Sequence, residues 1–138
     1  MSRVSHVLDT SALLAHYFDE PGADIVERLW ADRSVNPGIC AVTVAELRSR
    51  LKDETTDKAE AQTVVDAYVN ELAACLPVDR VVAEAAWHVK EATPGRLPLV
   101  DSLIAATARA AGAVLVHRDP HMAAIPREIV DQIVLPDR

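Results

Sequence analysis

The chain has 138 residues, of which 50% are hydrophobic and 25% charged, and its formal net charge is −7. This length and composition predict one globular domain over residues 1–138, large enough to bury a core without disulfides. The acidic balance disfavours charge-driven binding to nucleic acid, which needs a basic face, but it leaves open an enzyme that approaches phosphate through bound cations.

Neither membrane insertion nor secretion is expected from the sequence. It contains no run of about 18 apolar residues, and its N-terminus lacks a basic region followed by a long apolar core. Cys40 and Cys75 lie far apart, without the Cys-x-x-Cys spacing of a metal or redox motif. We therefore expect two buried free thiols in the reducing cytoplasm.

The first part of the chain alternates between apolar runs and helical patterns. The predicted elements are a strand over residues 4–8, a helix over 10–18, a helix from the turn at 19–22 to about residue 32, and a strand over 39–42. Asp9 directly follows the first strand and begins the first helix. Pro21 suits the first position of the second helix.

A pair of amphipathic helices comes next. Thr43 and Glu46 match a capping box, in which Thr43 caps a helix and the Glu46 side chain reaches back to it. The buried stripe of this helix is predicted to be Val44, Leu47 and Leu51. After a break at residues 55–57, apolar residues at three-to-four spacing predict a longer helix up to Leu72. The two helices, joined by a short link, are predicted to form a helical hairpin.

The remaining chain continues the alternation. The predicted elements are a minimal edge strand over residues 76–78, a helix capped by Asp79, an alanine-rich helix over 102–111 that starts at Asp101, a strand over 113–116, and a last strand within 129–135. Alternating strands and helices predict an α/β fold. It consists of a parallel sheet of four to five strands with helices on both faces, and the helical hairpin is an insertion.

Four acidic residues recur at the ends of these strand–helix units: Asp9, Glu46, Asp101 and Asp119. In a parallel sheet the C-termini of the strands share one edge, where ligands bind, so the four carboxylates are expected to face one cleft. Like charges raise one another's pKa. A divalent cation with oxygen ligands, Mg²⁺ or Mn²⁺, relieves this repulsion and holds substrate phosphate. Taken singly, each acid also suits a helix cap or a turn.

The segments that carry these acids resemble a known family. Residues 7–14 (VLDTSALL), 44–47 (VAEL), 100–108 (VDSLIAATA) and 116–119 (VHRD) are similar to the PIN domain, and more narrowly to the VapC toxins of bacterial toxin–antitoxin pairs. The resemblance covers nearly the whole chain. It implies a cytoplasmic, Mg²⁺- or Mn²⁺-dependent endoribonuclease that cuts single-stranded RNA (tRNA, rRNA or mRNA) and is inhibited by a cognate VapB-like antitoxin.

The resemblance also implies roles for individual residues. The residues that correspond to the catalytic, metal-binding acids of the family are Asp9, Glu46, Asp101 and Asp119. Ser11, with Thr10 as the second candidate, corresponds to the assisting polar position. Two residues depart from the pattern, because His117 stands where threonine or serine is common and His121 where a further acid is common. Family members form homodimers, which assemble with antitoxin into heterotetramers or larger complexes.

Other polar and aromatic residues are weaker candidates. Arg118 and Arg96 are candidates for contacts with RNA phosphates, because guanidinium groups suit that geometry. We interpret the two histidines that flank Asp119 as exposed loop residues, with metal or phosphate binding as the alternative. Trp30 and Tyr68 exceed the needs of one core and give some support to a homodimer.

Three other functions fit part of the pattern. A phosphohydrolase of the haloacid dehalogenase type also has an aspartate after its first strand, but it needs a second aspartate where Ser11 stands. A receiver domain needs an acidic pair in its first loop, which Asp9-Thr10 does not provide. A degenerate PIN-like binding module is expected to lack at least one of the four acids. The complete set therefore favours the ribonuclease.

Overall fold

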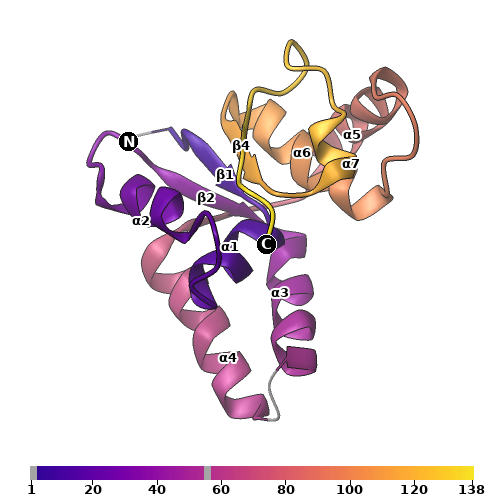
Figure 1. Cartoon of the computed structure of the whole chain (residues 1–138). Helices are drawn as coiled ribbons and strands as arrows, with labels where there is room; N and C mark the ends of the chain where they lie inside the picture. Colours follow the sequence, from indigo (N-terminus) through magenta and orange to yellow (C-terminus); the bar gives the residue numbers. More distant parts are fainter. Residues whose placement is uncertain (1–2, 55–56) are drawn as a thin grey trace.

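Figure 1 shows the computed structural model of the chain, which describes residues 3–54 and 57–138. One parallel sheet runs through it, with five strands in the order β3-β2-β1-β4-β5. The strands are β1 (His6–Leu8), β2 (Pro37–Cys40), β3 (Ala74–Leu76), β4 (Val114–His117) and β5 (Gln132–Val134). The predicted parallel sheet of four to five strands is confirmed, and so is the edge position of the strand near residue 76.

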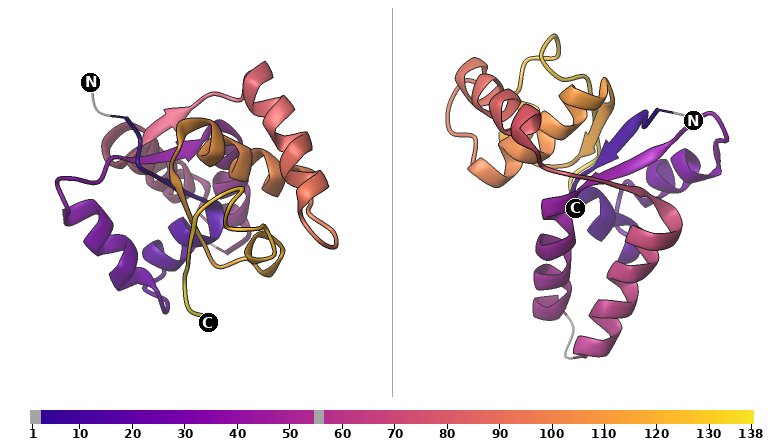
Figure 2. Two further views of the ribbon diagram at one scale, coloured as in Figure 1. Left: turned by 90° about the horizontal axis from the view of Figure 1, so that it is seen from above. Right: turned by 180° about the vertical axis from the view of Figure 1, so that it is seen from behind.

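Helices cover both faces of this sheet. They are α1 (Thr10–Tyr17), α2 (Ala23–Ala31), α3 (Ala41–Glu54), α4 (Lys58–Ala67) with the π-helical turn η1 (Tyr68–Leu72), α5 (Arg80–Ala92), α6 (Leu99–Ala111) and the short α7 (Pro120–Ala123). Figures 1 and 2 show α5 and α6 on one side of the sheet and α1 to α4 on the other. None of the helices in the described ranges has the length and apolar character needed to cross a membrane.

Strand residues alternate between two hydrophobic cores, because successive side chains of a strand point to opposite faces. Val7 and Leu115 pack in the core that α5 and α6 cover, whereas Leu8 and Val116 pack in the core formed with α1, α3 and α4. All four residues are fully buried. The predicted helices on both faces are therefore confirmed.

Three predicted helix starts are wrong. β2 extends to Cys40, which pairs with Leu76, and α3 begins at the next residue. Thr43 therefore lies inside the helix with its hydroxyl buried, and the predicted capping box with Glu46 does not form. The local capping pattern loses here to the strand pairing, which fixes where the chain leaves the sheet.

The other two starts shift for local reasons. Gly22, not Pro21, precedes the first residue of α2, and its φ of 99° is a left-handed conformation that glycine adopts without strain. α6 begins at Leu99 after Pro98, so Asp101 lies in the first turn instead of capping the helix. Asp79, by contrast, caps α5 as predicted.

The predicted helical hairpin is formed by α3 and α4, which project from one side of the sheet (Figure 1). Asp57 caps α4 by accepting hydrogen bonds from the backbone N–H groups of Ala59 and Glu60. Residues 55 and 56 of the predicted break lie outside the described residues. Leu47 and Leu51 are fully buried, and Val44 is half-buried and packs against the same core.

Trp30 and Tyr68 are used within the subunit. Their rings stack with centroids 5.7 Å apart, and the Trp30 indole N–H donates to the carbonyl of Leu72 at 2.7 Å. His16 Nδ1 lies 2.7 Å from the Tyr68 hydroxyl. The sequence-based support for a homodimer from these two aromatic residues therefore falls away.

Only one of the two thiols is buried. Cys40, in the inner strand β2, is fully buried, but Cys75 is exposed because β3 lies at the edge of the sheet. The prediction that both thiols are buried is wrong for Cys75. Sequence spacing does not distinguish an edge strand whose outer face is covered from one that faces solvent.

Candidate metal centre

The four predicted acids lie at the C-terminal edge of the sheet. Asp9 directly follows β1, Asp119 follows β4, Asp101 lies in the first turn of α6 and Glu46 in α3. Their charges interact, because Asp101 and Asp119 both raise the pKa of Asp9, and Asp119 and Glu46 raise that of Asp101. The topology therefore brings acids from four distant segments into one electrostatic cluster.

Asp9 both caps α1 and belongs to the acid cluster, which are the two roles that the sequence left open. Its side chain caps α1 by accepting the Ala12 N–H at 2.9 Å, and it also accepts the Ser11 hydroxyl at 2.6 Å. The residue is only 4% exposed, and this burial is the main reason that its pKa rises from 3.8 to about 7. The two hydrogen bonds oppose the rise, and the charges of Asp119 and Asp101 add to it.

The two hydroxyls after Asp9 each contact an acid. The Thr10 hydroxyl donates to Glu46 Oε1, which joins α1 to α3. The Ser11 hydroxyl donates to Asp9 and accepts the backbone N–H of Arg118 at 3.0 Å, which joins α1 to the loop after β4. Both residues therefore hold parts of the cluster in place, and Glu46 is oriented by Thr10 instead of by the capping box.

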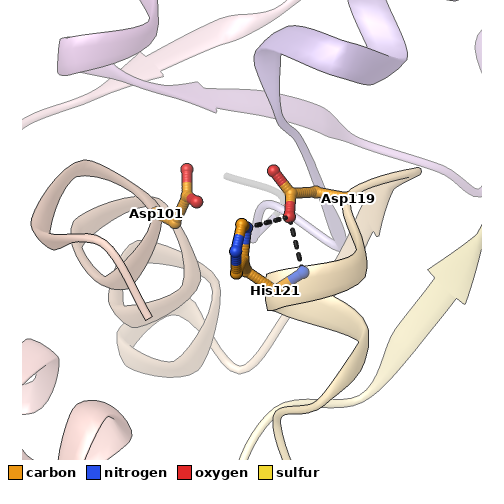
Figure 3. Close-up of side chains that lie close together, drawn as sticks. All are labelled: Asp101, Asp119 and His121. Carbon is orange, nitrogen blue, oxygen red and sulfur yellow. Dashed lines mark hydrogen bonds and ion pairs between the residues drawn. The ribbon is translucent and has the colours of Figure 1, made fainter. Parts of the chain in front are cut away.

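Among the described residues, the side chains that come close enough together to share a metal ion are those of Asp101, Asp119 and His121, without Asp9 or Glu46. One ligand atom from each lies within 4.8 Å of the others. Figure 3 shows these side chains converging from α6 and from the start of α7. Burial is the largest cause that raises the pKa of Asp101 to about 6, and the charge of Asp119 adds to it. From the sequence alone, His121 is interpreted as an exposed loop residue, and metal binding is the less favoured interpretation.

Asp119 is held by the start of α7. Its Oδ1 accepts the backbone N–H of His121 at 2.7 Å and that of Met122 at 3.4 Å, and the His121 ring nitrogen Nδ1 lies 3.3 Å from the same oxygen. The carboxylate thus caps the short helix and belongs to the acid cluster at the same time.

His117 is fully buried, so its interpretation as an exposed loop histidine is wrong. Its Nδ1 accepts the backbone N–H of Asp119 at 2.9 Å, which places the ring proton on Nε2. His117 Nε2 therefore donates to Gln132 Oε1, which lies 2.8 Å away. The Gln132 amide in turn donates to the Ile125 carbonyl at 2.7 Å. Because both ring nitrogens have partners, His117 supports the Asp119 turn and is no metal ligand here.

Arg118 forms an ion pair within the protein. Its side chain is only 10% exposed and its guanidinium donates to Glu20, which also pairs with Arg138 at 3.0 Å. The contact of Arg118 with RNA stays a prediction, and no sequence pattern pointed to its pairing with Glu20. Arg96 is exposed in the loop between α5 and α6, and its contact with RNA stays a prediction.

The family profile of the PIN domain matches residues 6–128. The chain therefore belongs to the PIN domain family. No curated protein sequence matches it significantly.

Similar chains occur in solved structures of toxin–antitoxin complexes. One is in VapBC2 from Rickettsia felis bound to a promoter DNA fragment (TM-score 0.76, 17% identity, 96% of this chain and 100% of that chain covered). Another is in DNA-bound VapBC from Salmonella typhimurium (0.73, 20%, 95% and 98%). A third is in VapBC-5 from Mycobacterium tuberculosis (0.70, 24%, 95% and 98%). At these identities the likeness shows the shared fold.

The cluster fits a divalent cation. Among the described residues, no lysine or arginine forms an ion pair with Asp9, Glu46, Asp101 or Asp119. Partly buried carboxylates without a cationic partner are costly, and their raised pKa values express that cost. Asp101, Asp119 and His121 are the residues that could hold the ion together, and Asp9 and Glu46 add negative charge that interacts with Asp101 and Asp119.

Proposed function

We propose that the chain is a Mg²⁺- or Mn²⁺-dependent endoribonuclease that hydrolyses single-stranded RNA, with Asp9, Glu46, Asp101 and Asp119 as its catalytic acids. The observation that carries the proposal is the convergence of these acids at one sheet edge without a lysine or arginine partner among the described residues. A bound divalent cation would neutralise the phosphate and lower the pKa of an attacking water. The family match, which covers residues 6–128, supports nuclease activity.

The residues of the chain have separable tasks in this reaction. Asp101, in the first turn of α6, and Asp119, at the N-cap of α7, would hold the cation. Ser11 fixes the orientation of the buried Asp9 carboxylate, and Thr10 fixes that of Glu46. The RNA therefore meets a preformed arrangement of charges, which is how positioned electrostatic groups accelerate phosphodiester hydrolysis.

A haloacid-dehalogenase-type phosphohydrolase is less compatible with the site. Such an enzyme needs a second aspartate two residues after the first, whereas Ser11 stands there and donates its hydroxyl to the Asp9 carboxylate. A degenerate binding module is disfavoured because all four acids are present and share one cluster.

We further propose that the chain is the toxin of a VapBC-type pair and works in the cytoplasm with a VapB-like antitoxin. The solved complexes of similar fold support this assignment. An open groove of about 550 Å³ runs along one face of α3. Its lining residues are Ala41, Val44, Ala45, Arg48, Ser49 and Lys52. An apolar antitoxin segment fits this groove, and an antitoxin arginine would bind the carboxylate cluster. A homodimer that assembles with antitoxin into a heterotetramer or a larger complex is part of this proposal.

The test is cleavage of a single-stranded RNA by the purified chain, with mapping of the ends. We expect cleavage with Mg²⁺ or Mn²⁺ and none in excess EDTA, because the metal-free carboxylates repel phosphate. Glu84→Gln, which changes an exposed acid on α5, is the matched control and should cut like the wild type. Full cleavage in excess EDTA would exclude the metal-dependent mechanism.

A further inference from the structure

The imidazole of His121 faces the carboxylates of Asp101 and Asp119 and lies outside both hydrophobic cores. Its side chain is 52% exposed, and its one ion-pair partner among the described residues is Asp119, at 3.3 Å. One ring nitrogen and one oxygen from each carboxylate lie within 4.8 Å of one another. These three atoms are close enough together to coordinate a single ion. Figure 3 shows the ring beside both carboxylates.

The backbone keeps this arrangement in place. His121 lies in the first turn of α7, and its own N–H donates to Asp119 Oδ1 at 2.7 Å. The hydrogen bond from Asp119 N–H to the buried His117 fixes the same turn from the other side. The imidazole and the Asp119 carboxylate are thus carried by one rigid turn, and Asp101 approaches from α6.

We propose that His121 is a direct ligand of the cation that Asp101 and Asp119 hold, and that its imidazole makes the site select Mn²⁺ over Mg²⁺. This inference rests on the proposed metal-dependent function. Mg²⁺ keeps its waters and favours oxygen ligands, whereas imidazole binds transition ions and carboxylates suit Mn²⁺. Of the two cations in the proposed function, Mn²⁺ is the one that accepts both kinds of donor.

The direct test is pulsed electron paramagnetic resonance of Mn²⁺ bound to the full-length chain. We expect electron spin-echo modulation from a coordinated ¹⁴N nucleus in the wild type and its loss in His121→Ala. Calorimetry should show the Mn²⁺ affinity of His121→Ala falling by roughly tenfold or more, since even an outer-shell partner of a ligand is worth that much. Its Mg²⁺ affinity should stay within about twofold, because the imidazole adds little to Mg²⁺ binding.

Two further variants make the test specific. His121→Asp supplies a carboxylate in place of the imidazole, so this variant should bind both Mn²⁺ and Mg²⁺ tightly. It should show no nitrogen modulation and a lower preference for Mn²⁺ than the wild type. His88→Ala removes an exposed histidine of α5 and should match the wild type in every measurement. Circular dichroism checks that each variant is folded.

The outcomes separate this inference from the proposed nuclease. Nitrogen modulation that disappears in His121→Ala supports the ligand assignment even if the chain cuts no RNA. Metal-dependent cleavage together with unchanged Mn²⁺ affinity in His121→Ala overturns the assignment and leaves the nuclease standing. Modulation that is absent from the wild type, or that persists in His121→Ala, also overturns it.

Discussion

Glu20 and the acid cluster of Asp9, Glu46, Asp101 and Asp119 differ in whether an arginine is paired with them. Glu20 is paired with Arg118 and Arg138. Burial alone would raise its pKa, but the two arginines outweigh burial and hold the pKa below the ordinary value. Asp9 and Asp101 are paired with no arginine or lysine among the described residues, and burial raises their pKa values to about 7 and about 6.

The contrast shows how the chain distributes its positive charge. Arg118 directly precedes Asp119, yet its guanidinium turns away from the acid cluster and binds Glu20. The nearest basic side chain in sequence is thus bound to Glu20, and it does not neutralise the acid cluster. We therefore expect loss of Glu20 to destabilise the fold and loss of a cluster acid to impair ligand binding.

The largest effect is expected when one charge is removed from the acid cluster. Asp101→Asn should lower RNA cleavage by at least about a hundredfold, as the loss of a preorganised charged group typically does. Its free energy of unfolding should stay level or rise, because repulsion within the cluster is relieved. Gel-based cleavage assays and urea titration measure the two effects. Cleavage at the wild-type rate would remove Asp101 from the proposed site.

The neutralised group predicts the opposite effect on stability. Glu20→Gln leaves the buried Arg118 guanidinium without a counter-charge and should lower the free energy of unfolding by about 2 to 3 kcal/mol. Asp24→Asn, which breaks the exposed pair with Arg28, should cost less than about 0.5 kcal/mol. Urea titration of both variants tests the comparison. Equal losses would show that burial of the Glu20 pair does not matter.

The pH dependence of the metal-free chain sharpens the contrast. The native pKa of Asp9, about 7, lies above its ordinary value of 3.8, so the folded chain binds this proton more tightly than the unfolded chain does. The resulting stability is present at low pH and is lost as the pH rises through about 7. Between about pH 5 and pH 8, wild type should lose on the order of 2 to 3 kcal/mol more than Asp9→Asn. An identical pH profile for the two chains would contradict the raised pKa.

The smallest expected effect concerns the turn that carries Asp119. His117→Leu removes the acceptor for the Asp119 N–H and should lower Mn²⁺ affinity by roughly tenfold. His117→Asn offers a carbonyl oxygen to the same N–H and should recover part of that loss, although both variants lose the bond to Gln132. Calorimetry measures the affinities. Equal affinities in the two variants would show that His117 does not position Asp119.

The sequence by itself determined the alternation of strands and helices and the placement of the acids. Apolar runs end directly before Asp9 and close to Asp119, and parallel strands end at one edge, so their convergence follows from connectivity alone. The hairpin of α3 and α4 and the cap at Asp79 also follow from local periodicity and local hydrogen bonding. These features depend on residues close together in the chain.

Only the tertiary structure decided the partners of individual polar groups. Thr10 rather than Thr43 orients Glu46, because strand pairing starts α3 earlier than its capping pattern predicts. Arg118 binds Glu20, and His117 is buried against Gln132. Each of these contacts joins segments far apart in the sequence, and a side chain with several possible partners takes the one that packing brings within hydrogen-bond distance.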